Sequence, residues 1–255
     1  MKTNSLAAVC LLGAFCGVGN AALIAQYDFT DFDLTDDELG NYNLSLVSNG
    51  SDTITIGPYG AAVFPGNDAE PDYLEVTGPG GSPDWTVSFW FRTPAVDQGG
   101  WQGLFSNNIS PSERYSWQVD SHDGTLRLVG SEGVTITNAD AGEPQIQPDV
   151  WHHVVARKES GSAELFFGTM GSLFSVGTDT NNPGGLQMFR LGTNRNSNAL
   201  YAMQMANVKI YNDSSVLLAD LNAEGPGLVP EPAALLIWSL LAGLGVGVGW
   251  RRRKR

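Results

Sequence analysis

Cysteine is almost absent from this chain. The sequence contains two cysteines, Cys10 and Cys16, and both lie within the N-terminal segment that ends at Ala21. Beyond Ala21 the chain therefore forms no disulfide, and it offers neither a thiol nucleophile nor a cysteine cluster for a structural zinc ion. The fold of that part must depend on core packing alone.

Basic residues are also scarce. The chain has 14 lysines and arginines against 27 acidic residues, which gives a formal net charge of −13. Lys2 and residues 251–255 are among the few basic positions, so the part between them is more acidic than the total suggests. Such a surface repels nucleic acid and anionic lipid headgroups. Two explanations of the acidity stay open, namely the solubility of an exported protein and acidic loops that hold calcium.

Charge is missing altogether from residues 233–250. A helix over these roughly 18 residues measures about 27 Å, close to the roughly 30 Å hydrocarbon core of a bilayer. A buried core helix usually keeps a polar stripe, whereas Ser239 is the one hydroxyl-bearing side chain here. Pro232 suits the first turn, and the basic residues 251–255 follow as a cytoplasmic stop. The run predicts one C-terminal transmembrane helix with the bulk of the chain outside the cytoplasm.

The first residues predict export as well. Lys2 gives a positive start, an apolar stretch covers residues 6–18, and a small-residue cleavage site follows. This pattern is typical of a secretory signal peptide over residues 1–21. Lipid attachment at Cys16 is disfavoured, because Phe15 stands where a lipoprotein signal has a small residue.

Between the two ends the sequence predicts an all-β domain. Short runs rich in β-branched and aromatic residues recur between clusters of Gly, Asn, Pro and Asp, and no helix is expected except at the ends. This spacing predicts a two-sheet sandwich over residues 22–223, followed by a linker at 224–232. The expected strands cover residues 23–29, 43–47, 53–56, 61–64, 73–76, 86–93, 103–106, 115–119, 125–129, 134–137, 151–158, 163–167, 189–191 and 203–211.

Several short motifs follow one another in a definite order along this domain. They are AAVFPG at 61–66, DYLEV at 72–76, WTVSFWFR at 85–92, VWHHVVA at 150–156, RLG at 190–192 and MANVKIYN at 205–212. Their order resembles that of the laminin-G-like, concanavalin A-like jelly roll, and the resemblance implies that two-sheet fold from about residue 24 to residue 213. That family usually has a Tyr-Val-Asp-Gly hairpin after the Trp-His-His strand. Here LFFGT at 165–169 lacks the aspartate, which leaves the detail of that turn open.

The C-terminus combines a Pro-Glu-Pro motif, the apolar run and a basic end. Together these features resemble the PEP-CTERM sorting signal of Gram-negative bacteria that produce exopolysaccharide. The resemblance implies an exosortase-type partner that cleaves near the motif, an inner-membrane intermediate, and a final place in the cell envelope, cell surface or extracellular matrix. A permanent single-pass anchor is the alternative, because the helix inserts by the same physics. The sorting residues are Val229, Pro230, Glu231, Pro232, Arg251, Arg252 and Arg253.

Catalytic motifs are missing too. Glucanases that share the jelly roll place two glutamates on one face of a strand, about 5 Å apart, and this sequence has no such pair. His152 and His153 are neighbours in an expected strand, so they point to opposite faces and do not serve one site. We expect one of them to be a buried, hydrogen-bonded core histidine, and His122 to lie in a turn beside Asp123-Gly124. The sequence therefore predicts no catalytic residue.

Ligand binding is the activity that remains. Proteins hold sugars with aromatic faces and hydrogen-bonding side chains, and residues 98–117 offer both. The alternative is that residues 98–117 form an ordinary polar loop in which Trp101 only covers the end of the core. The candidate ligand-binding residues are Trp101, Asn108 and Tyr115.

Calcium is the one cofactor that the resemblance suggests, because the matching region helps to bind it in some relatives. Carboxylate and amide oxygens are suitable ligands for this ion. The first candidates are Asn107 and Glu113, and the second are Asp68, Glu70 and Asp72.

Three functions are compatible with these observations. The first is an exported, non-catalytic module that binds an extracellular polysaccharide or an envelope protein. The second is a structural or adhesive envelope protein without a small ligand. The third is a glycoside hydrolase on the same fold, which requires two carboxylates roughly 5 to 10 Å apart in a cleft.

Overall fold

The computed structural model describes residues 22–48, 53–57, 60–66, 72–82, 84–96, 99–107, 116–130, 133–139, 143–196 and 202–227. The predicted signal peptide, the Pro-Glu-Pro motif and the predicted membrane helix lie outside these residues. The described elements are β1 (Leu23–Tyr27), β2 (Ser45–Val47), β3 (Thr55–Ile56), β4 (Ala62–Phe64), β5 (Tyr73–Ser82), β6 (Trp85–Arg92), β7 (Gln102–Asn107), β8 (Trp117–His122), β9 (Thr125–Gly130), β10 (Thr135–Thr137), β11 (His152–Glu159), β12 (Ser162–Thr169), β13 (Ser172–Asp179), β14 (Leu186–Leu191), β15 (Met203–Tyr211) and α1 (Leu218–Ala223).

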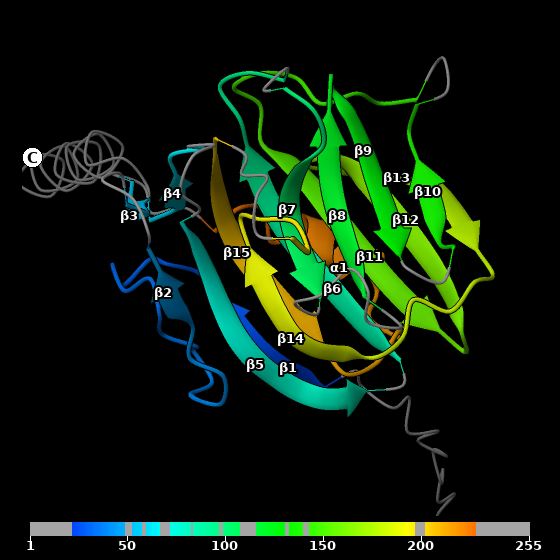
Figure 1. Ribbon diagram of the computed structural model, residues 1–255, viewed down its shortest axis with the longest axis horizontal. Coiled ribbons are helices and arrows are strands. Elements are labelled where there is room, and N and C mark those ends of the chain that lie inside the picture. Colours follow the sequence, from blue (N-terminus) through cyan, green and yellow to red (C-terminus); the bar gives the residue numbers. More distant parts are fainter. Residues whose placement is uncertain are drawn as a thin grey trace, which may run out of the picture.

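The strands form two antiparallel sheets that lie one behind the other in Figure 1. Sheet A has the order β13-β12-β11-β6-β15-β4-β3, and β1 also pairs with β15. Sheet B has the order β10-β9-β8-β7-β14-β5-β2. Each sheet thus has an inner face toward its partner and an outer face away from it. The predicted all-β, two-sheet sandwich is confirmed.

The inner faces of the two sheets meet in a row of aromatic rings. Trp85 of sheet A stacks on Trp117 of sheet B, with ring centroids 4.3 Å apart and an interplanar angle of 9°. Phe105 lies between Trp117 and Phe189, at 5.4 Å from each, and Tyr27 of sheet A meets Phe189 edge-on at 6.2 Å. All five side chains are fully buried. Because the rings come from both sheets, their contacts hold the sandwich together.

β15 organises sheet A because it pairs along both of its edges. One edge of β15 pairs with β6. Along the other edge, the start of β15 at Met203 pairs with β4, and its end at Tyr211 pairs with β1. A bulge interrupts the register with β6 between Ala206 and Lys209. Within it Asn207 has a positive φ of 47°, and its Nδ2 donates a hydrogen bond of 2.9 Å to the carbonyl oxygen of Gly225. The bulge therefore ties the C-terminal segment of the described chain to the sheet.

Two elements differ from expectation. The sequence predicted no strand over β13, whose side chains are largely exposed or half-buried at the edge of sheet A. An edge strand that buries little shows weak alternation, which is why the pattern missed it. Helix α1 has only 6 residues, too few for a helical period to stand out, and it was not expected. Within the described residues no helix is long and apolar enough to cross a bilayer.

Helix α1 covers part of the outer face of sheet A and lies at the far side of the molecule in Figure 1. Its Leu221 packs with Val155, Phe166 and Tyr211 in a small apolar cluster. Glu224, directly after the helix, forms an ion pair with Lys209 of β15. The segment that follows β15 is thus docked on the sheet instead of leading straight away from it.

His153 is the polar centre of this docking. Its ring stacks on Trp90, with centroids 4.5 Å apart, and its Nε2 lies 2.8 Å from the Ser88 hydroxyl. Its Nδ1 lies 3.0 Å from the side-chain amide of Asn222 in α1. His152 points to the inner side, where its ring packs against Phe91 and Phe167. The prediction of opposite faces is confirmed, but both histidines are buried, because α1 covers the one that faces outward.

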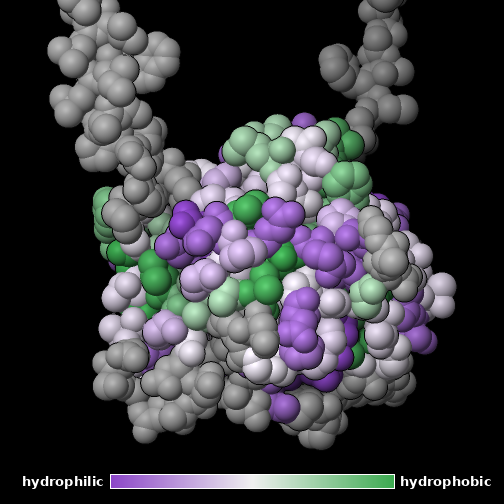
Figure 2. Space-filling model, turned by 90° about the horizontal axis from the view of Figure 1, so that it is seen from above, coloured by the Kyte–Doolittle hydropathy of each residue, from purple (hydrophilic) through white to green (hydrophobic). Residues whose placement is uncertain are grey.

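Figure 2 shows one face of the molecule, on which hydrophilic side chains predominate and hydrophobic ones appear between them in small patches. Some large hydrophobic side chains are exposed among the described residues, and they are Phe32, Leu39, Leu46, Met170, Phe174 and Leu217. They come from three parts of the chain, namely residues 32–46, residues 170–174 and Leu217.

We expect replacement of His153 by glutamine to reveal a pH-dependent contribution to stability. Burial lowers the pKa of His153 from 6.5 to about 4, so between these values the unfolded chain holds a proton that the folded chain lacks. The contribution of His153 is thus fully present above pH 6.5 and is lost as the pH falls toward 4. The difference in unfolding free energy between the parent and H153Q should shrink by about 3 kcal/mol from pH 7 to pH 4.

Urea denaturation followed by circular dichroism at several pH values measures this difference. A difference that stays constant over the whole range would contradict the burial of a neutral His153.

Candidate functional site

The outer face of sheet B carries a row of polar side chains. Along β8 the residues alternate, with Trp117 and Val119 buried in the core and Gln118 and Asp120 on the opposite, outer face. His122, at the end of β8, lies on the same face as Asp120. In β9, Leu126 and Leu128 enter the core, which turns Arg127 outward beside Asp120. The alternation that builds the core therefore also builds this polar row.

A tight hairpin places Asp120 opposite Arg127. Asp123 and Gly124 form the turn, both with positive φ, and this backbone suits a two-residue connection between twisted strands. The carboxylate of Asp120 accepts two hydrogen bonds from Arg127, at 2.9 Å from Nε and 2.6 Å from the terminal nitrogen. Such a bidentate pair holds both side chains in one orientation.

Trp101 lies directly on this ion pair. The guanidinium carbon of Arg127 is 3.7 Å from the centroid of the Trp101 ring, and the His122 ring is 5.5 Å from the same centroid. Trp101 is half-buried, so part of its indole remains open to solvent. A cation stacked on an indole is an attractive contact that fixes the plane of the ring.

A loop from sheet B adds Arg195 to the row. The segment after β14 crosses the sheet at Gly103, where a Cβ would lie only 2.0 Å from the backbone nitrogen of Asn194, so glycine is required there. Arg195 then donates through its backbone nitrogen and Nε to the Gln118 oxygen, at 3.0 and 3.2 Å. Gln118 in turn donates to Asp120 at 2.5 Å. We call Trp101, Gln118, Asp120, Arg127 and Arg195 the sheet B network.

The polar row continues across the sheet beyond this network. Strand register places Gln118 beside Ser106 of β7, Ser106 beside Arg190 of β14, and Arg190 beside Glu75 of β5. Arg190 donates to Glu75 at 2.8 Å, and its guanidinium lies 4.7 Å from the ring centroid of Tyr73. The outer face thus repeats one arrangement, in which an arginine is paired with a carboxylate and stacked on an aromatic ring.

Burial sets the electrostatics of the network. The Asp120 side chain is fully buried, and burial raises the pKa of its carboxyl, while the hydrogen bonds and charge of Arg127 oppose that rise. Burial likewise lowers the pKa of Arg195. Both oxygens of Asp120 accept hydrogen bonds from cationic or amide donors. This carboxylate is therefore placed to orient its neighbours.

Of the predicted ligand-binding residues, the structure describes Trp101 and places it in the sheet B network. Asn108 and Tyr115 lie outside the described residues, so their role stays a prediction. Gln118, Asp120, Arg127 and Arg195 were not named from the sequence. The Asp-Gly turn and the alternation of β8 and β9 already indicate that Asp120 faces Arg127, whereas nothing local indicates that Arg195 folds back over the sheet.

The proposed calcium ligands also stay a prediction. Asn107 is buried at the end of β7, where its side-chain oxygen accepts from the backbone nitrogen of Gln187 at 2.7 Å and its nitrogen donates to Gly185 at 3.0 Å. Asp72 is buried as well, and Glu113 lies outside the described residues, as do the second candidates Asp68 and Glu70. In the described part of the chain no three acidic or histidine side chains gather closely enough to share a metal ion.

Comparison with known families and structures supports the fold. Residues 68–217, more than half of the chain, match the family model described as the concanavalin A-like lectin/glucanases superfamily. No curated protein sequence matches the chain significantly.

Solved structures with a similar fold include one domain of an arabinanase and the binding domains of two toxins. Domain 4 of AbnA, a GH43 extracellular arabinanase from Geobacillus stearothermophilus, in complex with arabinotriose, is 21% identical with a TM-score of 0.59, over 79% of this chain and 98% of that one. The binding domain of Paraclostridial Mosquitocidal Protein 1 is 17% identical with a TM-score of 0.54, over 78% and 51%. The binding domain of botulinum neurotoxin DC in complex with SialylT is 13% identical with a TM-score of 0.55, over 78% and 49%.

These likenesses show the fold alone, because none of the three identities exceeds 21%. The family model over residues 68–217 confirms the predicted concanavalin A-like jelly roll. The match spans about half the length of each toxin domain.

We expect the Asp120–Arg127 pair to be strongly coupled. R127M leaves the fully buried Asp120 carboxylate without its main partner, which should lower the free energy of unfolding by about 3 kcal/mol or more. The double variant D120N/R127M removes the charge as well and should recover most of that loss. Urea denaturation measures both variants. In R92M, which breaks a more exposed pair with Asp149, the loss should stay below about 1 kcal/mol. Equal losses in the single and double variants would contradict the coupling.

Proposed function

Because the chain belongs to the concanavalin A-like lectin/glucanases superfamily, we propose that it is an exported, non-catalytic module that binds a glycan on the outer face of sheet B. The observation that carries this proposal is the sheet B network, in which Trp101 is held in place by Arg127 beside further hydrogen-bonding side chains. The carbohydrate ligands in the titles of two similar structures agree with it, although they belong to those proteins.

The chemistry of this face suits a sugar. A sugar ring has an apolar face of C–H groups that packs on an indole, and a rim of hydroxyls that both donate and accept hydrogen bonds. Trp101 supplies the flat surface, and the partly exposed Arg127 and His122 beside it supply hydrogen-bonding groups. Because their side chains are already fixed by one another, little conformational entropy is lost on binding.

The open part of the polar row lies at its Trp101 end. In the middle of the row Ser106 and Asp120 are 0% exposed and Gln118 is 7% exposed, and the segment that carries Arg195 crosses the sheet there. A sugar would therefore meet this face at Trp101, His122 and Arg127, whose side chains stay partly exposed.

The same geometry argues against hydrolysis. A general acid needs a carboxyl that is free to deliver its proton to the ligand. Burial raises the pKa of Asp120, as such an acid requires, but both of its oxygens are engaged by Arg127 and Gln118. Glu75 is likewise paired with Arg190. We infer that these carboxylates position the binding face and do not transfer protons.

Export and sorting complete the proposal. The signal peptide pattern at residues 1–21 would deliver the domain across the inner membrane. The Pro-Glu-Pro motif at 230–232, the apolar run and the basic end would then bring it to an exosortase-type enzyme, which releases or attaches it at the cell envelope or in the extracellular matrix. An acidic, thiol-free domain suits that location.

Binding to a glycan array and to purified bacterial exopolysaccharides tests the proposed site. We expect W101A to bind at least about tenfold more weakly than the parent, because it loses the stacking surface while the core stays intact. The matched control is F174A, which removes an exposed aromatic ring from sheet A and should bind like the parent. Equal affinity of W101A and the parent would place any glycan site elsewhere, and a folded parent that binds no glycan would overturn the proposed function.

Variants of the C-terminus test the sorting proposal in the producing bacterium. Deletion of residues 229–255 should send the domain to the medium without processing. Replacing Pro230, Glu231 and Pro232 with alanines keeps the apolar helix, so this variant should remain in the membrane at the mass of the uncleaved chain. Mass spectrometry of the envelope and medium fractions reads out both. If the alanine variant and the parent have the same mature mass, the tail acts as a permanent anchor.

A further inference from the structure

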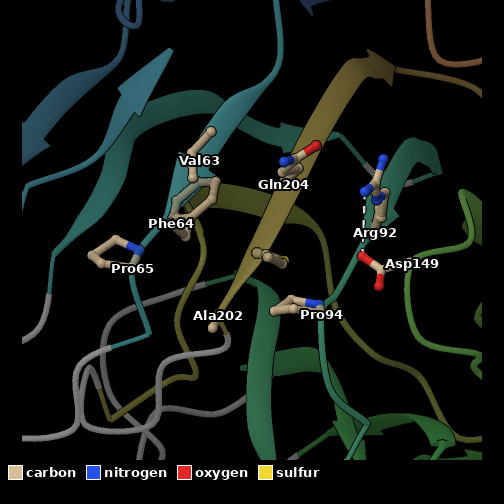
Figure 3. Close-up of a pocket in the computed structure, with 9 residues that line it drawn as sticks. Val63, Phe64, Pro65, Arg92, Pro94, Asp149, Ala202 and Gln204 are labelled. Atoms are coloured by element: carbon tan, nitrogen blue, oxygen red, sulfur yellow. Dashed lines mark hydrogen bonds and ion pairs between the residues drawn. The ribbon is translucent and has the colours of Figure 1, made fainter. Parts of the chain in front are cut away.

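A hollow of about 280 Å³ lies at one end of sheet A, away from the sheet B network. Figure 3 shows Val63, Phe64 and Pro65 on one side of it, Arg92 and Asp149 on the other, and Gln204 between them on β15. We call it the Arg92 pocket. Its lining combines apolar rings and methyl groups with one guanidinium, one carboxylate and one amide.

The strand register places the polar groups of this pocket on the outer face of sheet A. Gln204 of β15 lies opposite Val63 of β4 on one side and Arg92 of β6 on the other. Met203, which precedes Gln204, and Phe91, which precedes Arg92, have their side chains buried in the core. Gln204 and Arg92 therefore point outward, at the end of β15 that α1 does not cover. The pocket and the sheet B network thus lie on opposite outer faces of the sandwich.

The ion pair in the pocket is unusually open. Arg92 donates one hydrogen bond of 3.2 Å to Asp149, and the two side chains are 34% and 67% exposed. In every other ion pair that a lysine or arginine forms in the described part of the chain, at least one of the two side chains is less exposed than in this pair. For comparison, the Asp120 side chain is 0% exposed. An exposed pair with a single bond contributes little to stability, so its groups remain able to bind a ligand.

A turn places Asp149 beside the pocket. Its φ is 60°, in the left-handed region that aspartate, unlike most residues, readily adopts in turns. The backbone nitrogen of Asp149 donates a hydrogen bond of 2.7 Å to the carbonyl oxygen of Thr93, which fixes the turn next to the end of β6. The carboxylate thereby faces Arg92 across the mouth of the pocket (Figure 3).

We propose that the Arg92 pocket binds one neutral sugar ring as a second subsite, an inference that rests on the proposed glycan-binding function. Neighbouring hydroxyls of a sugar match an adjacent donor and acceptor, which Arg92 and Asp149 provide, with the Gln204 amide able to act as either. The rings of Pro65 and Pro94 offer an apolar surface for the C–H face. An acidic sugar fits less well, because its carboxylate meets Asp149 on a chain of net charge −13.

Two subsites on opposite faces make the module bivalent. One polysaccharide chain that binds at Trp101 on sheet B and a second that enters the Arg92 pocket would be joined by a single protein. The protein would then cross-link polysaccharide chains in a matrix, which a module with one site does not do.

Titration of W101A with methyl glycosides tests the pocket apart from the first site. The full chain, kept in a zwitterionic detergent because of its apolar C-terminal run, is titrated with the methyl glycosides of glucose, galactose, mannose and arabinose and with methyl glucuronide. Saturation-transfer NMR measures binding.

We expect a neutral glycoside to bind in the millimolar range and methyl glucuronide to bind more weakly. W101A/R92Q and W101A/D149N should each weaken the neutral glycoside at least tenfold, whereas W101A/R157Q, which changes an arginine outside the pocket, should not.

The outcomes separate this inference from the proposed function. If no neutral glycoside binds W101A, or if R92Q and D149N leave its affinity unchanged, the second subsite is wrong, while polysaccharide binding that depends on Trp101 would still support the first site. Tighter binding of methyl glucuronide than of every neutral glycoside would overturn the neutral-sugar assignment. If the parent raises the turbidity of a polysaccharide solution and R92Q binds it without doing so, cross-linking is supported; equal turbidity would contradict it.

Discussion

Contact between the inner faces of two sheets is what the rest of this molecule depends on. The chain beyond Ala21 has no cysteine, so no disulfide joins sheet A to sheet B. Trp85 of sheet A meets Trp117 of sheet B across the gap instead, Tyr27 of sheet A meets Phe189 of sheet B, and all four rings are fully buried. Since a strand alternates its side chains between two faces, every ring committed to this contact leaves a neighbour on the outside. The inner packing thereby decides which side chains are available for function.

The two outer faces are used in different ways. On sheet A, α1 covers His153 and ties the C-terminal segment down through Asn222, Glu224 and Gly225. This arrangement keeps the described chain attached to the body almost up to the proposed sorting motif. On sheet B the segment that carries Arg195 lies over Gly103 and Gln118, while Trp101 and Arg127 beside it stay partly exposed. The proposed sites therefore lie where each outer face is left open, at Trp101 on sheet B and at the Arg92 pocket on sheet A.

Scarcity of basic residues shapes both proposed sites. Between the two termini the chain has few arginines, and one in each proposed site is paired with a carboxylate, Arg127 with Asp120 and Arg92 with Asp149. Burial separates their roles. The buried Asp120 holds Arg127 rigidly under Trp101, whereas the exposed Asp149 leaves Arg92 open to a ligand. A paired donor and acceptor with little net charge suits the hydroxyls of a sugar better than an anion.

Local pattern predicted much of this structure. Strand β15 matches the expected residues 203–211, and the opposite orientation of His152 and His153 is confirmed. These predictions depend on alternation and turn residues, which are properties of neighbours in the sequence. β13 and α1 were not predicted, because the hydrophobic periodicity of a poorly buried edge strand and of a six-residue helix is too weak to recognise in the sequence.

By itself, then, the sequence determined the all-β class, the absence of disulfides and which residues lie on which side of a strand. The tertiary structure decided the rest. Arg195 reaches Gln118 across 77 positions, and Arg92 reaches Asp149 across 57. Such contacts depend on which strands become neighbours in a sheet and on a glycine that lets a loop cross it. That order follows from packing the whole chain at once, because no short stretch contains the information about its distant partner.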